Sequence, residues 1–325
     1  MSGDTDLNRH LEAYLAIRDA LGLAAGARPR LLRSFLDHAR EAMPPGAPLR
    51  AATALTWAHD HAPPGCGVAG KAHRLTVARG FLAYLSAMVP GTEVPAHGLL
   101  ATPRRQRPYI LSDAEIEMVI AAAGKAPPRG TLRPVALSAL LGLLASTGLR
   151  IGEAVRLRVD DVRLEADPPH LRVLQTKFQK SRLVPLHPSA AAALAAYLRR
   201  REDLGYHALS DAVFVAERGG PLHVGLLGVW FGKLTRKLGL WPGKQNTTEA
   251  RRRPSLHSFR HSFAVRRLRA WHEADLDVQA LLPTLSVYLG HLQPEDTYWY
   301  LTATPELLRA AGARFTPDGV VAGEP

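Results

Sequence analysis

Apolar residues recur at helical spacing over most of the first hundred residues. The pattern predicts four helices, over residues 6–22, 29–43, 48–61 and 69–88. The segments AMPPGAP and APPGCG fall between them, and such proline- and glycine-rich runs interrupt helices. We therefore expect the first part of the chain to be a small all-helical domain.

Beyond residue 110 the pattern changes from helical to strand-like and back to helical. Ser112 and Glu115 have the spacing of a capping box that opens a helix, and residues 132–147 are apolar on nearly every face, as in a buried helix. Three segments rich in β-branched residues predict strands, namely VDDVRLE, HLRVLQT and RLVPL. Helical spacing returns over 188–201, 223–238, 259–272 and 276–289. This order predicts an α+β domain that is mostly α with a small antiparallel sheet.

The stretch VPGTEVPAHGLLATPRRQRPYI separates the two patterns. It holds several Pro and Gly residues, carries three arginines and has no apolar periodicity, so it is expected to be extended. The chain is therefore predicted to comprise a helical domain over 1–95, a basic linker over 96–110 and a second domain over 111–325.

Composition excludes several classes of protein. The 325 residues are 46% hydrophobic and 22% charged, which is typical of a folded domain and not of a disordered chain. Cys66 is the only cysteine, so a disulfide scaffold is excluded. The sequence has no apolar run of about 18 residues, and its polar, acidic start MSGDTDLNRH does not resemble a secretory signal. We expect a cytoplasmic protein without a membrane partner.

Positive charge is concentrated in the second part of the chain. The net charge is +12, and residues 1–98 hold ten Lys and Arg against eight Asp and Glu, so the other +10 belongs to residues 99–325. A solvated arginine-rich surface is one interpretation, but the excess favours an anionic partner, with nucleic acid ahead of a membrane surface. Arginines cluster at positions 104, 105 and 107, at 251–253, and at 266, 267 and 269.

Four short patches in the second part carry candidate chemistry. In STGLRIGEAVRL, Arg150 stands three residues before Glu153, so the two share a helical face and could form a salt bridge and nothing more. In TKFQKSRLVPL, Lys177 and Lys180 lie near the tip of a predicted hairpin, where lysines are usually just solvated. Each of these patches taken alone favours a structural interpretation.

The other two patches contain histidines. In HSFRHSFAVRRL, His257 and Arg260 are three residues apart and would share a face at a helix start. His257 and His261 also have the spacing of zinc ligands, but no cysteine cluster or HExxH pattern accompanies them, so a metal site is disfavoured. In LGHLQPEDTYWYL, His291 follows a glycine that could end a helix, and the two tyrosines after it would usually be core residues.

Taken together, the four patches resemble the tyrosine recombinase (phage integrase) family. The contexts TGLRIGE, TK-x-x-K-x-R-x-VPL, HSFRHSFA and LGH, and a tyrosine nine residues after that histidine, match the family pattern over about residues 107–310. Over 1–95 the resemblance rests on position and helical content. It implies a site-specific recombinase or integrase that cleaves and rejoins DNA strands through a 3′-phosphotyrosyl intermediate, without a metal or other cofactor.

The resemblance also implies roles for individual residues. Arg150 and Arg260 correspond to the two arginines that clamp the scissile phosphate, and Lys177 corresponds to the hairpin lysine that protonates the leaving 5′-oxygen. His257 and His291 correspond to the two residues that flank the pocket. Guanidinium groups suit the clamp because they stay charged and bind phosphate oxygens in a bidentate manner.

Tyr300 corresponds to the nucleophile of the family, because of its spacing from the preceding histidine. Tyr298 is its rival, but on a helix the two side chains would point about 200° apart and could not serve one phosphate. Glu153 corresponds to an acidic residue that orients its neighbours, and His261 to a frequent histidine with a structural role.

Double-stranded DNA is the expected partner. The first domain would correspond to the helical core-binding (SAM-like) domain of the family, and the linker would join two halves that clamp a duplex. The residues expected to contact the DNA backbone are Lys71, Arg74, Arg104, Arg105, Arg107, Lys180, Arg251, Arg252 and Arg253. The segment TATPELLRAAGARF predicts a last helix with Thr304 as its N-cap, and in the family such a tail often docks on a neighbouring protomer, giving a synaptic tetramer on DNA.

Three alternatives stay open at this point. The same pocket could belong to a type IB topoisomerase-like or telomere-resolving enzyme. The fold could also belong to a non-catalytic DNA-binding regulator, although the complete set of catalytic residue types argues against it. A zinc enzyme that uses His257 and His261 is the third. Among recombinases, the ending TYWYLTATPEL is more typical of mobile-element integrases than of chromosomal resolvases.

Overall fold

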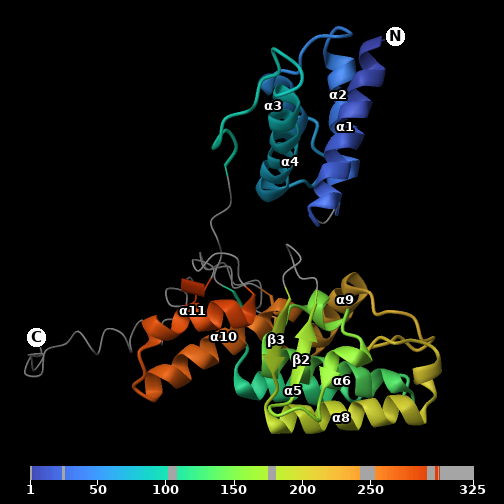
Figure 1. Cartoon of the computed structure of the whole chain (residues 1–325), viewed down its shortest axis with the longest axis vertical. Coiled ribbons are helices and arrows are strands. Elements are labelled where there is room, and N and C mark those ends of the chain that lie inside the picture. The colour runs from blue at the N-terminus through green and yellow to red at the C-terminus, as the bar shows by residue number, and fades with distance from the viewer. Residues whose placement is uncertain are drawn as a thin grey trace, which may run out of the picture. The chain divides into compact units, whose positions relative to one another are not determined.

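The computed structural model describes residues 2–23, 26–101, 108–174, 181–241, 253–290, 297, 298 and 300 (Figure 1). The described residues up to 101 form one compact unit, and those from 108 onward form a second. Each unit has its own hydrophobic core, as structural domains do. Within the described ranges, no helix combines the length and the apolar character needed to cross a membrane.

The first unit is a bundle of the four helices that the apolar pattern predicted. They are α1 (Ser2–Ala20), α2 (Arg28–Ala42), α3 (Ala51–His59) and α4 (Val68–Ser86). Helix α4 contacts each of the other three, and Phe35, Trp57 and Phe81 are completely buried among them. The periodic apolar positions of the four segments therefore meet in one core.

The second unit is mostly helical with a small antiparallel sheet, which confirms the predicted fold class. Its helices are α5 (Asp113–Ala123), α6 (Leu132–Thr147), α7 (Ile151–Ala154), α8 (Pro188–Asp203), α9 (Val224–Lys237), α10 (Leu256–Glu273) and α11 (Val278–Leu289). Two short 3-10 helices are η1 (Val159–Asp161) and η3 (Tyr206–Ala208). The strands are β1 (Val162–Arg163), β2 (His170–Val173) and β3 (Arg182–Pro185), in the order β1-β2-β3.

Helix α6 lies at the centre of this unit. Ten of its residues are buried, and it contacts α5, α8 and α10, which explains why its sequence is apolar on nearly every face. It ends at Gly148, whose φ of +63° is left-handed. A Cβ atom at Gly148 would lie 2.6 Å from Phe263 of α10, so a glycine is needed for α10 to approach the end of α6.

The sheet turns one face toward the core. Leu171 of β2 pairs with Val184 of β3, and both are completely buried. Because side chains alternate along a strand, Arg182 lies on the same inner face as Val184. Strand β3 also contacts α11, so an arginine on its inner face can reach the C-terminal helices.

Candidate active site

Arg150 follows directly from the end of α6. The turn at Gly148 and the buried Leu149 lead to Arg150, which has an extended backbone and immediately precedes α7. Its Nη1 donates to Oε1 of Glu153 at 2.9 Å, and its backbone N–H donates to Oε2 at 3.0 Å. The sequence LRIGE therefore folds into a local ring of hydrogen bonds that fixes the arginine at the start of α7.

Glu153 is a buried carboxylate with a second cationic partner. Arg182 donates from Nη2 to Oε2 at 2.8 Å and from Nη1 to Oε1 at 3.2 Å. Burial alone would raise the pKa of Glu153, but the hydrogen bonds and charge of Arg182, helped by Arg150, lower it to about 2. The carboxylate is therefore charged and shared by two arginines.

Arg260 is a buried cation on α10, with 1% of its surface exposed. Its Nη1 donates to the carbonyl oxygen of Gly148 at 3.0 Å, and its Nη2 donates to that of Leu289 at 2.7 Å. Burial, followed by the charge of Arg150, lowers the pKa of Arg260 to about 10. The group therefore stays charged at neutral pH, and the two carbonyls replace part of its lost hydration.

The C-terminal end of α11 binds three arginines. Carbonyl 288 accepts from Nε of Arg182 at 2.8 Å, carbonyl 289 accepts from Arg260, and carbonyl 290 accepts from Nη2 of Arg150 at 2.9 Å. The last carbonyls of a helix lack partners within it and carry the negative end of its dipole. The helix ends at Gly290, with a left-handed φ of +69°, so the glycine does end a helix as its sequence context suggested.

Tyr300 belongs to a small apolar cluster with residues of α10 and α11, and is 2% exposed. Its hydroxyl shares a hydrogen bond of 3.0 Å with Nδ1 of His261. The ring of His257 stands edge-on to that of His261, with centroids 4.5 Å apart. Negative charge on Tyr300 would raise the pKa of Arg260, so these two groups are within electrostatic reach. Tyr298, in contrast, is 47% exposed.

The structure brings together the catalytic candidates that it describes, which are Arg150, His257, Arg260 and Tyr300, together with the supporting Glu153. Other predicted site residues lie outside the described residues, and they are Arg104, Arg105, Arg107, Lys177, Lys180, Arg251, Arg252 and His291. The predicted helix that begins at Thr304 also lies outside them.

Arg74 is not placed to contact DNA, and its sequence assignment needs correction. It is 6% exposed, and its Nη2 donates to the carbonyl oxygens of Trp57 and His61 at 2.9 and 3.1 Å. Its guanidinium also stacks on the Trp57 ring at 3.8 Å, and burial lowers its pKa. Arg74 therefore holds α4 against α3, while Lys71, one turn earlier and half-buried, remains the DNA-contact candidate in this helix.

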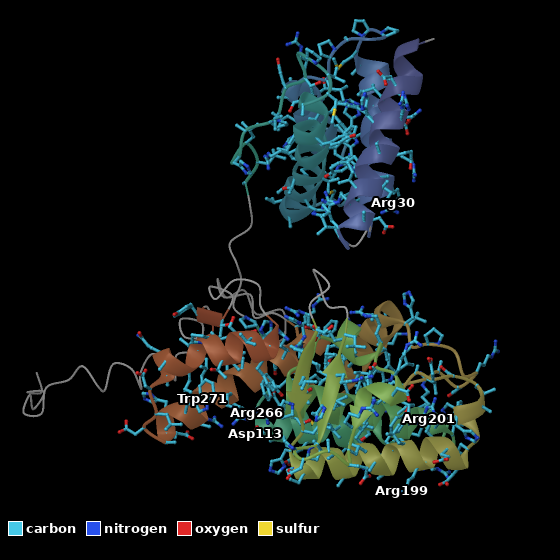
Figure 2. All side chains as sticks on the ribbon, viewed as in Figure 1. Arg30, Asp113, Arg199, Arg201, Arg266 and Trp271 are labelled. Atoms are coloured by element: carbon cyan, nitrogen blue, oxygen red, sulfur yellow. The ribbon has the colours of Figure 1, made fainter. Side chains whose placement is uncertain are left out.

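Two arginines in the second half of α10 also form contacts with a carboxylate of the protein. Arg266 donates to Oδ1 of Asp113 at 3.1 Å, and the two labelled side chains lie together in Figure 2. Arg269 lies 3.8 Å from the same carboxylate. This cluster therefore helps to attach α10 to the start of α5, which reduces the positive charge that it can offer to an anionic partner.

Arg253 remains a candidate for an anion contact. It is exposed, and its guanidinium packs on the ring of Trp241 at 4.4 Å. Arg236 at the end of α9 packs on the same ring at 3.9 Å. Stacking on an aromatic ring orients a guanidinium without occupying its N–H donors.

Arg182 belongs to the site, although its sequence context predicted no role for it. A signal for it was present, because in RLVPL the arginine stands two residues before Val184, and alternating residues of a strand share a face. An arginine on the buried face of a strand requires a carboxylate or carbonyl partner. The sequence alone did not show that this partner would be Glu153, which is 29 residues away.

The cluster contains three guanidinium groups and one carboxylate beside a buried tyrosine. Such an excess of fixed positive charge suits a phosphate diester and the charge that develops on its oxygens during displacement. Within the described ranges, no three His, Cys, Asp or Glu side chains are grouped closely enough to hold a metal ion.

Fold and comparisons together define a tyrosine recombinase, an enzyme that cleaves and rejoins DNA strands. The chain belongs to the phage integrase family, whose pattern matches residues 110–306. The integrase/recombinase y4rB of Sinorhizobium fredii (strain NBRC 101917 / NGR234) is 38% identical over 309 residues, which cover 94% of this chain and 95% of that protein. The tyrosine recombinase XerD of Mycobacterium tuberculosis (strain ATCC 25618 / H37Rv) is 34% identical over 66% of this chain and 63% of its own.

Solved structures support the same fold. The XerH site-specific recombinase bound to palindromic difH substrate has a TM-score of 0.64 and 18% identity, covering 93% of this chain and 82% of that chain. The Tn1549 transposon integrase in complex with transposon right end DNA has a TM-score of 0.61 and 17% identity, covering 94% and 99%. The relatives support the recombinase interpretation, and not the topoisomerase-like, telomere-resolving or regulatory alternatives.

Proposed function

We propose that Tyr300 of this chain attacks the scissile phosphate of a double-stranded DNA target. The new bond from the tyrosine oxygen to phosphorus replaces the bond to the 5′-oxygen, which leaves a 3′-phosphotyrosyl link and a free 5′-hydroxyl. Attack by the 5′-hydroxyl of another strand reverses the step, so no energy-rich cofactor is consumed. The observation that carries the proposal is the placement of Tyr300. The residue is buried, its hydroxyl is hydrogen-bonded to His261, and it lies within electrostatic reach of Arg260.

Arg150 and Arg260 are proposed to bind the non-bridging oxygens of the phosphate. In each arginine, Nη1 donates one hydrogen bond to a protein oxygen and Nη2 donates another. These two bonds fix the position of the guanidinium. A guanidinium has five N–H groups, so donors remain for the phosphate. Cations held rigidly beside the reacting atoms stabilise developing negative charge without reorganising, and this stabilisation commonly contributes more to catalysis than any other effect.

Proton transfer is proposed to involve the histidines and a lysine. The Tyr300 proton passes to a neighbouring histidine. His261 is within hydrogen-bond distance of the Tyr300 hydroxyl, and the ring of His257 contacts the ring of His261. His291 flanks the phosphate, as the family resemblance implies. Lys177 supplies the proton that the departing 5′-oxygen takes up, again as the resemblance implies.

DNA is the proposed partner of both units. Residues 1–95 act as the core-binding domain, 96–110 as the linker and 111–325 as the catalytic domain, and a synaptic tetramer assembles on the target. Among the described residues, Lys71 and Arg253 are the proposed backbone contacts. Support comes from XerH, the Tn1549 integrase and a lambda integrase dimer, each of which was solved bound to DNA.

A role in the integration of a mobile element is proposed over the resolution of chromosome dimers. The proteins y4rB and y4rE, both named integrase/recombinase, align with 94% and 96% of this chain. XerD aligns with 66% of it. The reaction is proposed to take place in the cytoplasm, where the DNA substrate lies.

A nicked duplex that contains the binding site tests the reaction. Footprinting on the DNA that flanks the gene first locates this site. The wild-type chain is expected to form an adduct that survives denaturation, because the nick lets the cleaved fragment diffuse away and traps the intermediate. Tyr300→Phe is expected to form none, while the matched control Tyr298→Phe retains adduct formation. An adduct with Tyr300→Phe would refute the assignment of the nucleophile.

A further inference from the structure

Glu153 is bound by two arginines that differ in exposure. The side chain of Arg150 is 34% exposed, whereas that of Arg182 is 11% exposed and that of Glu153 is 3% exposed. Arg150 is therefore the more exposed arginine of the pair. Arg182 approaches the carboxylate from the inner face of β3, so it acts from inside the protein.

A carboxylate beside Arg150 would by itself oppose phosphate binding. An isolated Arg–Glu pair has no net charge, so the repulsion between Glu153 and a phosphate would offset much of the attraction by Arg150. Arg182 adds a second cation with both of its Nη atoms on the two carboxylate oxygens. Two cations and one anion leave the group with a net charge of +1.

Further contacts hold Arg182 in this position. Its Nε donates to the carbonyl oxygen of Tyr288 at 2.8 Å. Its guanidinium also packs against Gly290, where an added Cβ would lie 2.9 Å from Nη1. Each of its three nitrogens thus donates a hydrogen bond to a protein oxygen, in the planar geometry that an arginine and not a lysine provides.

We propose that Arg182 is a positioning residue that offsets the charge of Glu153 and so keeps Arg150 effective as a phosphate ligand. Arg182 does not touch the reacting atoms, and its effect passes through the shared carboxylate. The proposal rests on the proposed function, because it requires that Arg150 binds the scissile phosphate.

Loss of Arg182 should add a pH dependence that the wild-type protein lacks. The groups around the carboxylate are Arg150 ahead of α7, Arg182 on β3 and Arg260 on α10, and Tyr288 of α11 lies within reach of Arg182. Without Arg182, burial favours the neutral acid, so the pKa of Glu153 rises. Protonation of Glu153 would then release Arg150 from its counter-charge.

The test compares Arg182→Gln with Arg172→Gln, which removes an arginine from the other face of the same sheet. The probe is the nicked duplex with the footprinted site. We expect Arg182→Gln to form the adduct at least about tenfold more slowly than wild type at neutral pH, with DNA affinity unchanged, and Arg172→Gln to match wild type. The rate of Arg182→Gln relative to wild type should rise as the pH is lowered from about 8 to about 5.

Two further variants separate charge from geometry. Arg182→Gln combined with Glu153→Gln restores the net charge of +1 and should recover part of the lost rate, without the pH dependence. Arg182→Lys keeps the cation but cannot bind both carboxylate oxygens in the planar fork, and should stay closer to wild type than to Arg182→Gln. If Arg182→Gln does not fold, the adduct rate of Arg182→Lys is compared with that of wild type instead.

A pH-independent rate ratio with no recovery in the double variant would overturn the role of Arg182. A rate for Arg182→Lys as low as that of Arg182→Gln would overturn it as well, because the charge is retained. If wild type itself forms no adduct with the footprinted duplex, the proposed function fails instead, so the two failures are distinguishable.

Discussion

The guanidinium of Arg260 and the carbonyl oxygen of Gly148 are joined by a hydrogen bond of 3.0 Å, although the two residues are 112 positions apart. The bond connects the end of α6 to α10. The left-handed conformation of Gly148 directs its carbonyl toward Arg260, and the absent Cβ leaves room for Phe263 of the same helix. One glycine therefore determines both how α10 packs and where its buried arginine lies.

Replacing Gly148 with alanine is expected to destabilise the second unit by about 2–4 kcal/mol. The left-handed φ and the 2.6 Å approach of the new Cβ to Phe263 both contribute. Adduct formation should also slow, because the strained turn displaces the residue 148 carbonyl that accepts from Arg260. Urea unfolding and the adduct assay measure the two effects. Gly142→Ala is the control, because its Cβ meets nothing within 4 Å in the middle of α6, and it should stabilise by about 0.5–1 kcal/mol. Equal stability of the two variants would contradict the prediction.

Substitution of the clamp arginines should separate binding from cleavage. Arg150→Ala and Arg260→Ala are expected to lower the rate of adduct formation at least about 100-fold, while DNA affinity measured by gel shift stays close to wild type. The reason is that many backbone contacts determine affinity, whereas the clamp acts mainly on the charge that develops in the transition state. A parallel loss of affinity and rate would mean that these arginines only dock the DNA.

The second unit should become less stable at low pH, because Glu153 becomes protonated there. Its pKa is about 2 in the folded protein against an ordinary value of 4.5, so its stabilising charge is present above about pH 4.5 and is lost as the pH falls toward about 2. This lowering of the pKa corresponds to about 3 kcal/mol of stability. The gap in unfolding free energy between wild type and Glu153→Gln should therefore narrow over this interval. A gap that is constant with pH would exclude the linkage.

Arg74 and Lys71 offer a matched pair on one helix. Arg74→Met removes two hydrogen bonds and a ring contact from a buried site, so the first unit should lose about 2–4 kcal/mol of stability while the salt dependence of DNA binding is unchanged. Lys71→Ala should leave stability intact and reduce the slope of log affinity against log salt by about one. If Arg74→Met instead reduced the salt slope without loss of stability, Arg74 would be a DNA contact after all.

Much of the fold followed from the sequence because its elements depend on local rules. Apolar periodicity located most of the long helices of both units, and Ser112 and Glu115 form the expected capping box with hydrogen bonds of 2.7 and 3.2 Å. The pairing of Arg150 with Glu153 also followed from their spacing. Contacts between residues three or four positions apart are determined largely by helix geometry, so they can be predicted without the rest of the chain.

Contacts between distant segments could not be predicted in this way. Arg74 shares the helical face of the buried Ala78 and Phe81, so its burial follows from the α4 sequence. Its partner, the Trp57 carbonyl of α3, does not. Arg266 is likewise paired with Asp113, which is 153 residues away. The local pattern shows whether an arginine lies on a buried face, but only the tertiary packing decides which acceptor it binds there.

The three arginines that meet at the end of α11 bind main-chain oxygens, and this has a consequence for how the protein can evolve. A carbonyl oxygen is kept when the side chain of its residue changes, so substitutions at positions 288 and 289 remove no acceptor, provided that the helix still stops at Gly290. The positions of the three arginines are therefore less sensitive to substitutions in the residues that bind them. Lineages could acquire new target sites through surface side chains while the arrangement that cuts DNA is inherited unaltered.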